Sequence, residues 1–173
     1  TKIMRHLRLN TVQEMYEENE ANFQHFESNQ ADIPQYINYV LYRSVCCYYV
    51  GKYEEAARWI NNLLNEISLK KYPIAQLEIK VILALQYCLV DDYDLFNQLI
   101  NSIQRQIRLI GKEKCEHLLI FTKMLKISLS DIKKNKAEKI SELAKKFDQI
   151  NIPLTAHTKL IKIDDALIEK LSK

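Results

Sequence analysis

The sequence predicts an all-α protein built as a stack of antiparallel helix pairs. Its 173 residues are 47% hydrophobic and 27% charged, which is typical of a folded globular chain rather than a disordered one. It contains only 2 Gly and 3 Pro. Tight hairpins and phosphate-binding loops depend on glycine, so both are unlikely in this chain. The third observation, a repeat of apolar positions every 40 residues, indicates how the helices are arranged.

The repeat is visible when the chain is aligned with itself at an offset of 40 residues. Three rows of apolar residues then coincide: Ile60, Ile100 and Ile140; Leu63, Ile103 and Leu143; and Ile67, Ile107 and Phe147. Within each period these positions are three and four residues apart, so they share one face of a helix. Each period therefore reads as two antiparallel helices, the second of which carries the rows.

The predicted pairs occupy residues 34–69, 73–110 and 112–150, with their helices at 34–50, 53–69, 73–90, 93–110, 112–129 and 133–150. Gly51, Asp91 and Asp131 fall in the turns within the pairs, where Gly or Asp tolerates the backbone of a tight turn and Asp can cap the next helix. Pro73 fits the first turn of its helix, where an amide proton would be unpaired.

The two ends of the chain differ from the central pairs. Residues 12–28 read as the second helix of an earlier pair, with Tyr16, Phe23 and Phe26 facing inward. Residues 3–9 then read as the end of that pair's first helix. After Pro153, a single helix over 154–171 is predicted to cap the stack. We interpret 1–173 as one repeat domain, and we expect further helical repeats upstream of Thr1 in a longer protein, such as a larger bacterial regulator.

Charge is unevenly distributed along the chain. Residues 1–103 hold nine basic and 13 acidic side chains, whereas residues 104–173 hold 16 basic and nine acidic ones. A basic second half can attract acidic partners or nucleic acid, although helix charges most often form a solvated face.

The four cysteines show no disulfide pattern and read as small buried hydrophobes, which favours a reducing, cytoplasmic setting. No apolar run is long enough to predict a membrane span.

No catalytic, cofactor-binding or metal-binding residues are predicted. The sequence lacks the motifs of zinc proteases, P-loop proteins, serine hydrolases and dinucleotide-binding proteins. Cys115 and His117 are two residues apart, so a helix directs them to different sides. Asp91, Asp92 and Asp94 are expected to cap a helix rather than to bind calcium. The cluster of tyrosines between Tyr36 and Tyr53 is expected to pack between helices, the alternative being a platform that stacks on a ligand.

The segment Tyr48-Tyr49-Val50-Gly51-Lys52-Tyr53-Glu54-Glu55-Ala56-Ala57 resembles the turn and second-helix start of a tetratricopeptide (TPR) repeat. The small Ala56 precedes Ile60 by four residues and Leu63 by seven, as in that family. The second pair departs from the pattern with Phe96 at the place of Ala56, and the period exceeds the family's 34 residues. The resemblance implies a right-handed α-solenoid with a TPR-like period of about 40.

The resemblance also implies a binding site, because the first helices of TPR-like pairs line a concave, peptide-binding groove. The groove positions carried over are Asn38, Leu41, Val45, Tyr48, Glu78, Val81, Leu85, Cys88, Leu118, Phe121, Leu125 and Ser128. Nine of these twelve are apolar or aromatic, so either an amphipathic partner segment or the chain itself should cover them.

Three functions follow as hypotheses. The leading one is a non-enzymatic scaffold that binds a protein or peptide segment in this groove. The second is a ligand- or peptide-sensing regulatory domain of a larger protein. The third is nucleic-acid binding through the basic C-terminal half, which a steep salt dependence would reveal.

Overall fold

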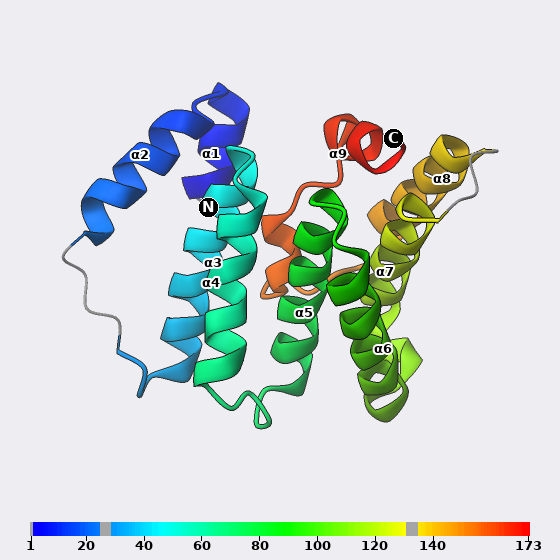
Figure 1. Cartoon of the computed structure of the whole chain (residues 1–173), viewed down its shortest axis with the longest axis horizontal. Helices are drawn as coiled ribbons and strands as arrows, with labels where there is room; N and C mark the ends of the chain where they lie inside the picture. Colours follow the sequence, from blue (N-terminus) through cyan, green and yellow to red (C-terminus); the bar gives the residue numbers. More distant parts are fainter. Residues whose placement is uncertain (1, 25–28, 131–134) are drawn as a thin grey trace. The chain divides into compact units, whose positions relative to one another are not determined.

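The computed structural model describes residues 2–24, 29–130 and 135–173, and all regular structure in these ranges is helical (Figure 1). The prediction of an all-α protein is confirmed. The chain divides into two compact units, Thr1–Ser68 and Leu69–Lys173. The division falls between the first and second predicted helix pairs.

Within its described residues, the N-terminal unit contains four helices: α1 (Lys2–Leu9), α2 (Val12–Phe23), α3 (Ile33–Tyr49) and α4 (Tyr53–Glu66). Helices α3 and α4 pack along each other, α2 packs on α3, and α1 packs on α2. The side chain of Asp32 caps α3 by accepting a hydrogen bond of 3.2 Å from the backbone N–H of Gln35.

Arg43 of α3 organises the tyrosine-rich part of this unit. Its guanidinium forms a 2.7 Å ion pair with Glu20 of α2 and lies 4.6 Å from the ring centroid of Trp59 in α4. Phe23 and Tyr39 pack edge to face, with centroids 5.1 Å apart. The aromatic side chains therefore join α2, α3 and α4, and the interpretation of the tyrosines as interhelix packing residues is confirmed for these contacts.

The described part of the C-terminal unit (69–130 and 135–173) contains five α-helices and two 3₁₀ turns: α5 (Pro73–Leu89), α6 (Tyr93–Ile110), η1 (Lys112–Cys115), α7 (Glu116–Ser128), α8 (Lys136–Gln149), η2 (His157–Leu160) and α9 (Asp165–Leu171). Helix α5 packs against both α6 and α7, α7 packs against α8, and η2 returns to lie on α5 (Figure 1). Helix α9 packs on α8 and α7.

The bounds of the predicted helices between residues 34 and 150 agree with the observed ones to within a few residues in the described ranges, except that 112–115 form the 3₁₀ turn η1. The turns within the first two pairs use left-handed backbone, which Gly and Asp tolerate, with φ of 81° at Gly51 and 56° at Asp91. Asp92 caps α6 through a 3.0 Å hydrogen bond from the N–H of Leu95. Ile60 and Ile100, on the second helices of their pairs, are both buried, and so is Ile140 of α8. Asp131 and Phe26 lie outside the described residues.

The prediction of one capping helix over 154–171 is wrong. The backbone is extended at Ile161 and again at Asp164, so the segment is broken into η2 and the short α9. Asp164 is the reason that α9 starts where it does, because its side chain accepts a 3.1 Å hydrogen bond from the N–H of Leu167. Pro153 consequently begins no helix.

Candidate functional site

Helix α5 buries a carboxylate in an otherwise largely apolar face. Its buried residues run from Leu77 to Cys88 with a single interruption at Lys80, and Glu78 is only 3% exposed within that run. A buried charge is costly unless ionised or polar partners surround it. The residues that surround Glu78 define the candidate site.

The segment that returns to α5 supplies the main partner of Glu78. His157, at the start of η2, donates its backbone N–H to Oε2 of Glu78 at 3.1 Å. Its ring Nδ1 lies 2.7 Å from the same oxygen and is the donor, since an ionised carboxylate only accepts. One carboxylate oxygen thus holds both the backbone and the side chain of His157.

His117 of α7 approaches the other oxygen of Glu78. Its Nε2 lies 3.6 Å from Oε1, which is beyond hydrogen-bond distance, and the side chain is 7% exposed. This nitrogen has no hydrogen-bond partner among the described residues. The site therefore contains one fully engaged carboxylate oxygen and one buried imidazole nitrogen with unused hydrogen-bonding capacity.

Ionisation of Glu78 follows from these contacts. Burial alone would raise its pKa, but the interactions with His117 and His157 outweigh burial and lower the pKa below its ordinary value of 4.5. The carboxylate is thus charged at neutral pH and fixes the returning segment to α5. Burial also raises the pKa of the nearby Cys115 thiol, with the Glu78 charge as a smaller cause.

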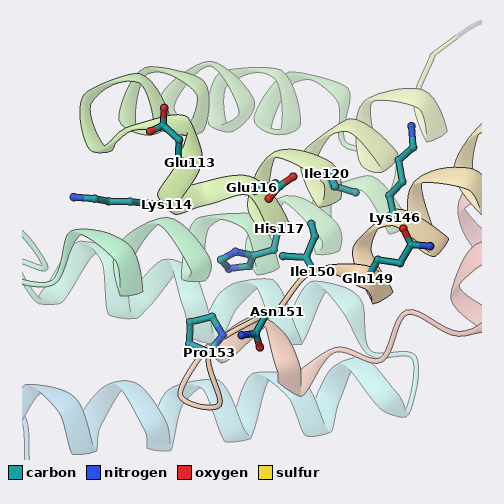
Figure 2. A pocket seen from close by; sticks show the side chains of 10 residues that line it. All are labelled: Glu113, Lys114, Glu116, His117, Ile120, Lys146, Gln149, Ile150, Asn151 and Pro153. Atoms are coloured by element: carbon teal, nitrogen blue, oxygen red, sulfur yellow. The ribbon is translucent and has the colours of Figure 1, made fainter.

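Two hollows adjoin this cluster and share His117, Lys114 and Pro153. One, of 500 Å³, extends from Glu78 and His157 past Ile74 of α5. The other, of 660 Å³, is bordered by η1, α7, the end of α8 and the segment after it. Figure 2 shows the ring of His117 beside Pro153 and Asn151 in the second hollow. Most side chains around that hollow are exposed, so it opens to solvent.

The structure buries the residues that the TPR resemblance assigned to a partner-binding groove. Nine of the ten principal positions are 5% exposed or less: Leu41, Val45, Tyr48, Glu78, Val81, Leu85, Leu118, Phe121 and Leu125. Asn38 is exposed, Cys88 is buried, and Ser128 is half-buried. These nine side chains are too buried to contact a partner, which corrects their assignment to a partner-binding groove.

The physical reason is clearest at α5. The returning segment places Ala156, Thr158 and Ile161 in buried positions, and its η2 turn packs on α5. Of the two ways of covering the apolar residues, a partner segment or the chain itself, the structure uses the chain itself on this helix. Phe121 of α7 is likewise enclosed and meets Phe147 of α8 edge to face, with centroids 5.9 Å apart.

Sequence reasoning missed the joint role of Glu78, His117 and His157. It placed Glu78 in the groove on family resemblance and treated the histidines as scattered. The available signal was a glutamate in a nearly continuous apolar helix, because such a carboxylate must find a partner in the fold. Nothing in the sequence identified which residue that partner would be.

The described residues offer no group of three or more His, Cys, Asp or Glu side chains that could hold a metal ion. In the same part of the chain, every helix is too short or too polar to cross a bilayer. The chain matches no protein-family model, no curated protein and no solved structure. Function must therefore be argued from the structure.

Proposed function

We propose that the chain is a non-enzymatic interaction module that binds a segment of another protein at the surface formed by α7, α8 and the segment that follows α8. The observation that carries this proposal is the composition of the 660 Å³ hollow (Figure 2). Ile120 and Ile150 are half-buried there, whereas Glu116, Lys146 and Gln149 around them are exposed. An apolar centre with a polar, solvent-exposed rim is the usual arrangement of a protein interface.

This proposal keeps the predicted function but moves its site. The first helices were expected to receive the partner, but α5 is already covered by its own chain at η2. Of the residues that line the hollow between α7, α8 and the following segment, all except His117 are exposed or half-buried. A partner segment can reach it without displacing a buried part of the fold.

The finer features of the fold belong to the same proposal. We propose that the pairs α3–α4, α5–α6 and α7–α8 are units of a right-handed, TPR-like solenoid. The 40-residue register of the buried isoleucines supports this arrangement. We also propose that the protein is cytoplasmic, because its four cysteines form no disulfide in the structure and are buried in the manner of small hydrophobes.

A second candidate function is the sensing of a small ligand, and Nε2 of His117, which has no hydrogen-bond partner among the described residues, favours it. That nitrogen is buried beside the 500 Å³ hollow, where a ligand could supply the missing hydrogen bond. Ligand contact there would act on the Glu78–His157 attachment. Binding that changes neither the His117 nor the His157 ring signals in NMR spectra would exclude this candidate.

A site-specific photocrosslinker tests the leading proposal. Benzoylphenylalanine placed at Gln149, on the rim of the hollow, is expected to give a discrete protein adduct in lysate from the source cells. The same group at Asn101, exposed on α6, serves as the matched control and should give none. The partner identified from the adduct is then purified, and its affinity should fall at least tenfold with Ile150→Glu.

Two results would contradict the proposal. Equal adducts at both positions would indicate non-specific contact. An adduct made of RNA or DNA would assign the surface to nucleic-acid binding instead.

A further inference from the structure

One exposed face runs along both α7 and α8. On α7 it contains Glu116, Ile120, Lys123 and Ile127, and on α8 with its C-cap it contains Lys139, Leu143, Lys146 and Ile150. Successive members are three or four residues apart, so each set lies on one side of its helix. The two helices pack against each other, and we call this surface the α7–α8 seam.

The seam is hollowed in two places. The 660 Å³ hollow of Figure 2 includes Ile120, Lys146 and Ile150. A second hollow, of 400 Å³, includes Ile127 and Leu143. Because Ile120 and Ile127 are two helical turns apart on the same side of α7, the hollows follow one line along the seam.

The floor of the seam is apolar and its flanks are basic. Ile127 and Leu143 are half-buried, with side chains partly open to solvent. The flanks of the 400 Å³ hollow carry three exposed lysines and one glutamate, which are Lys123, Lys126, Lys139 and Glu142. None of these lysines, nor Lys146, forms an ion pair with any residue in the described ranges.

We propose that the α7–α8 seam binds an acidic, amphipathic helix of a partner protein. This inference rests on the proposed function and specifies the chemistry of the partner. The apolar stripe of such a helix would cover Ile127 and Leu143, while its Glu or Asp residues would meet the unpaired lysines on the flanks. From Glu116 to Ile127 the seam is about 17 Å long, which corresponds to roughly three turns of a bound helix.

The lining of the seam favours a peptide over a nucleic acid. Single-stranded nucleic acids are bound by aromatic side chains that stack on bases within a basic groove. Neither hollow of the seam is lined by Phe, Tyr or Trp, and Glu142 and Glu116 interrupt the basic surface. A half-buried aliphatic floor matches the apolar face of a helix instead.

Fluorescence anisotropy with the full chain tests this inference. The probe is a synthetic 15-residue helical peptide with leucines at i, i+3, i+4 and i+7 and glutamates on both sides of this stripe. Two control peptides replace the glutamates by glutamine or the leucines by serine, and a 15-nucleotide single-stranded RNA is the third control. We expect binding of the first peptide only, and we expect its affinity to weaken as salt rises, because the flanking charges are exposed.

The double variant Lys123→Glu/Lys139→Glu should weaken binding of the acidic peptide about ten- to thirtyfold, since each reversal replaces an attraction by a repulsion. Lys145→Glu/Lys112→Glu is the matched control, because both lysines are exposed but lie outside the hollows. It should change the affinity less than threefold. Ile127→Ala, which keeps every charge, should also weaken binding by about fivefold through the lost apolar contact. Thermal melts confirm that the variants are folded.

The inference is overturned if the glutamine peptide binds as tightly as the acidic one, if both double variants have the same effect, or if the RNA binds best. Its failure is distinct from failure of the proposed function. If crosslinking at Gln149 captures a protein partner while the acidic peptide does not bind, the interaction module stands and only the partner chemistry is wrong.

Discussion

Replacing Glu78 by glutamine removes the charge that attaches the returning segment to α5 while keeping the size of the side chain. In the native protein, Oε2 of Glu78 accepts from the N–H of His157 at 3.1 Å and from its Nδ1 at 2.7 Å. A glutamine whose oxygen takes the place of Oε2 can still accept from both donors, but it does so as a neutral group. Both bonds are then weaker than bonds to a carboxylate, and the negative charge that faces His117 is lost.

The size of the effect follows from these contacts. A hydrogen bond to a charged group contributes about 1.5–3 kcal/mol and a neutral one about 0.5–1.5 kcal/mol, so the variant weakens each of the two bonds by roughly 1–1.5 kcal/mol. We therefore expect Glu78→Gln to lower the free energy of unfolding by about 2–3 kcal/mol at pH 7. Glu78→Ala removes the acceptor of both half-buried donors of His157 and leaves a cavity at a buried position, and it should cost about 3–5 kcal/mol.

The effect should depend on pH in one direction. The pKa of Glu78 in the folded protein is lower than its ordinary value of 4.5, so the unfolded chain binds this proton more readily. The stabilisation is therefore fully present above about pH 4.5 and is lost as the pH falls through the folded-state pKa. The difference between the native protein and Glu78→Gln should shrink over that acidic range.

Urea denaturation at a series of pH values measures this difference. Glu113→Gln is the matched control, because Glu113 is an exposed carboxylate on η1, and it should change stability by less than about 0.5 kcal/mol. Amide hydrogen exchange at His157 gives a local measurement and should become faster in Glu78→Gln. Unchanged stability, or a deficit that is the same at acidic and neutral pH, would refute this account of the site.

Three further outcomes are expected. Phe121→Ala should lower the free energy of unfolding by about 3–5 kcal/mol, because Phe121 is fully buried. A loss below about 1 kcal/mol in urea denaturation would contradict this prediction. Arg43→Lys removes the planar guanidinium that lies 4.6 Å from the ring centroid of Trp59, the only tryptophan. The variant should therefore lose about 1–3 kcal/mol of stability and show a changed tryptophan emission spectrum. An unaltered emission spectrum would argue against the contact. Burial raises the pKa of Cys47 to about 12 and that of Cys88 to about 11. Ellman's reagent at pH 8 should therefore label neither thiol in the native protein, but all four thiols after denaturation. Rapid labelling of the native protein would show that these buried sites open.

Local signals in the sequence predicted most of the helices. The isoleucine rows were predictable because a helix that packs on one side must repeat its apolar residues every three to four positions. The turn at Gly51 and the cap at Asp92 were predictable because each depends on the conformation or hydrogen bonding of a few adjacent residues. These features need no knowledge of distant parts of the chain.

The C-terminal segment was not predictable in the same way. The contact between Glu78 and His157 joins residues 79 positions apart, and no periodicity links them. The apolar spacing after Pro153 suited a helix, but tertiary contacts with α5 hold Ala156 to Ile161 in a 3₁₀ turn and extended backbone. Asp is a common helix N-cap residue, so a cap at Asp164 was predictable. The sequence did not show, however, that no helix would continue from Pro153 up to Asp164.

Helix α5 explains why the first-helix groove was misplaced. Its residues from Leu77 to Cys88 are apolar nearly all round, and a helix of this kind is normally buried on every side rather than on one stripe. A face that apolar would not remain open in water, so the chain covers it with η2 and secures the cover through Glu78 and His157. Helices α7 and α8 instead keep charged residues beside half-buried isoleucines and a leucine. A surface of this mixed composition can stay open to water, and it is there that we propose a partner binds.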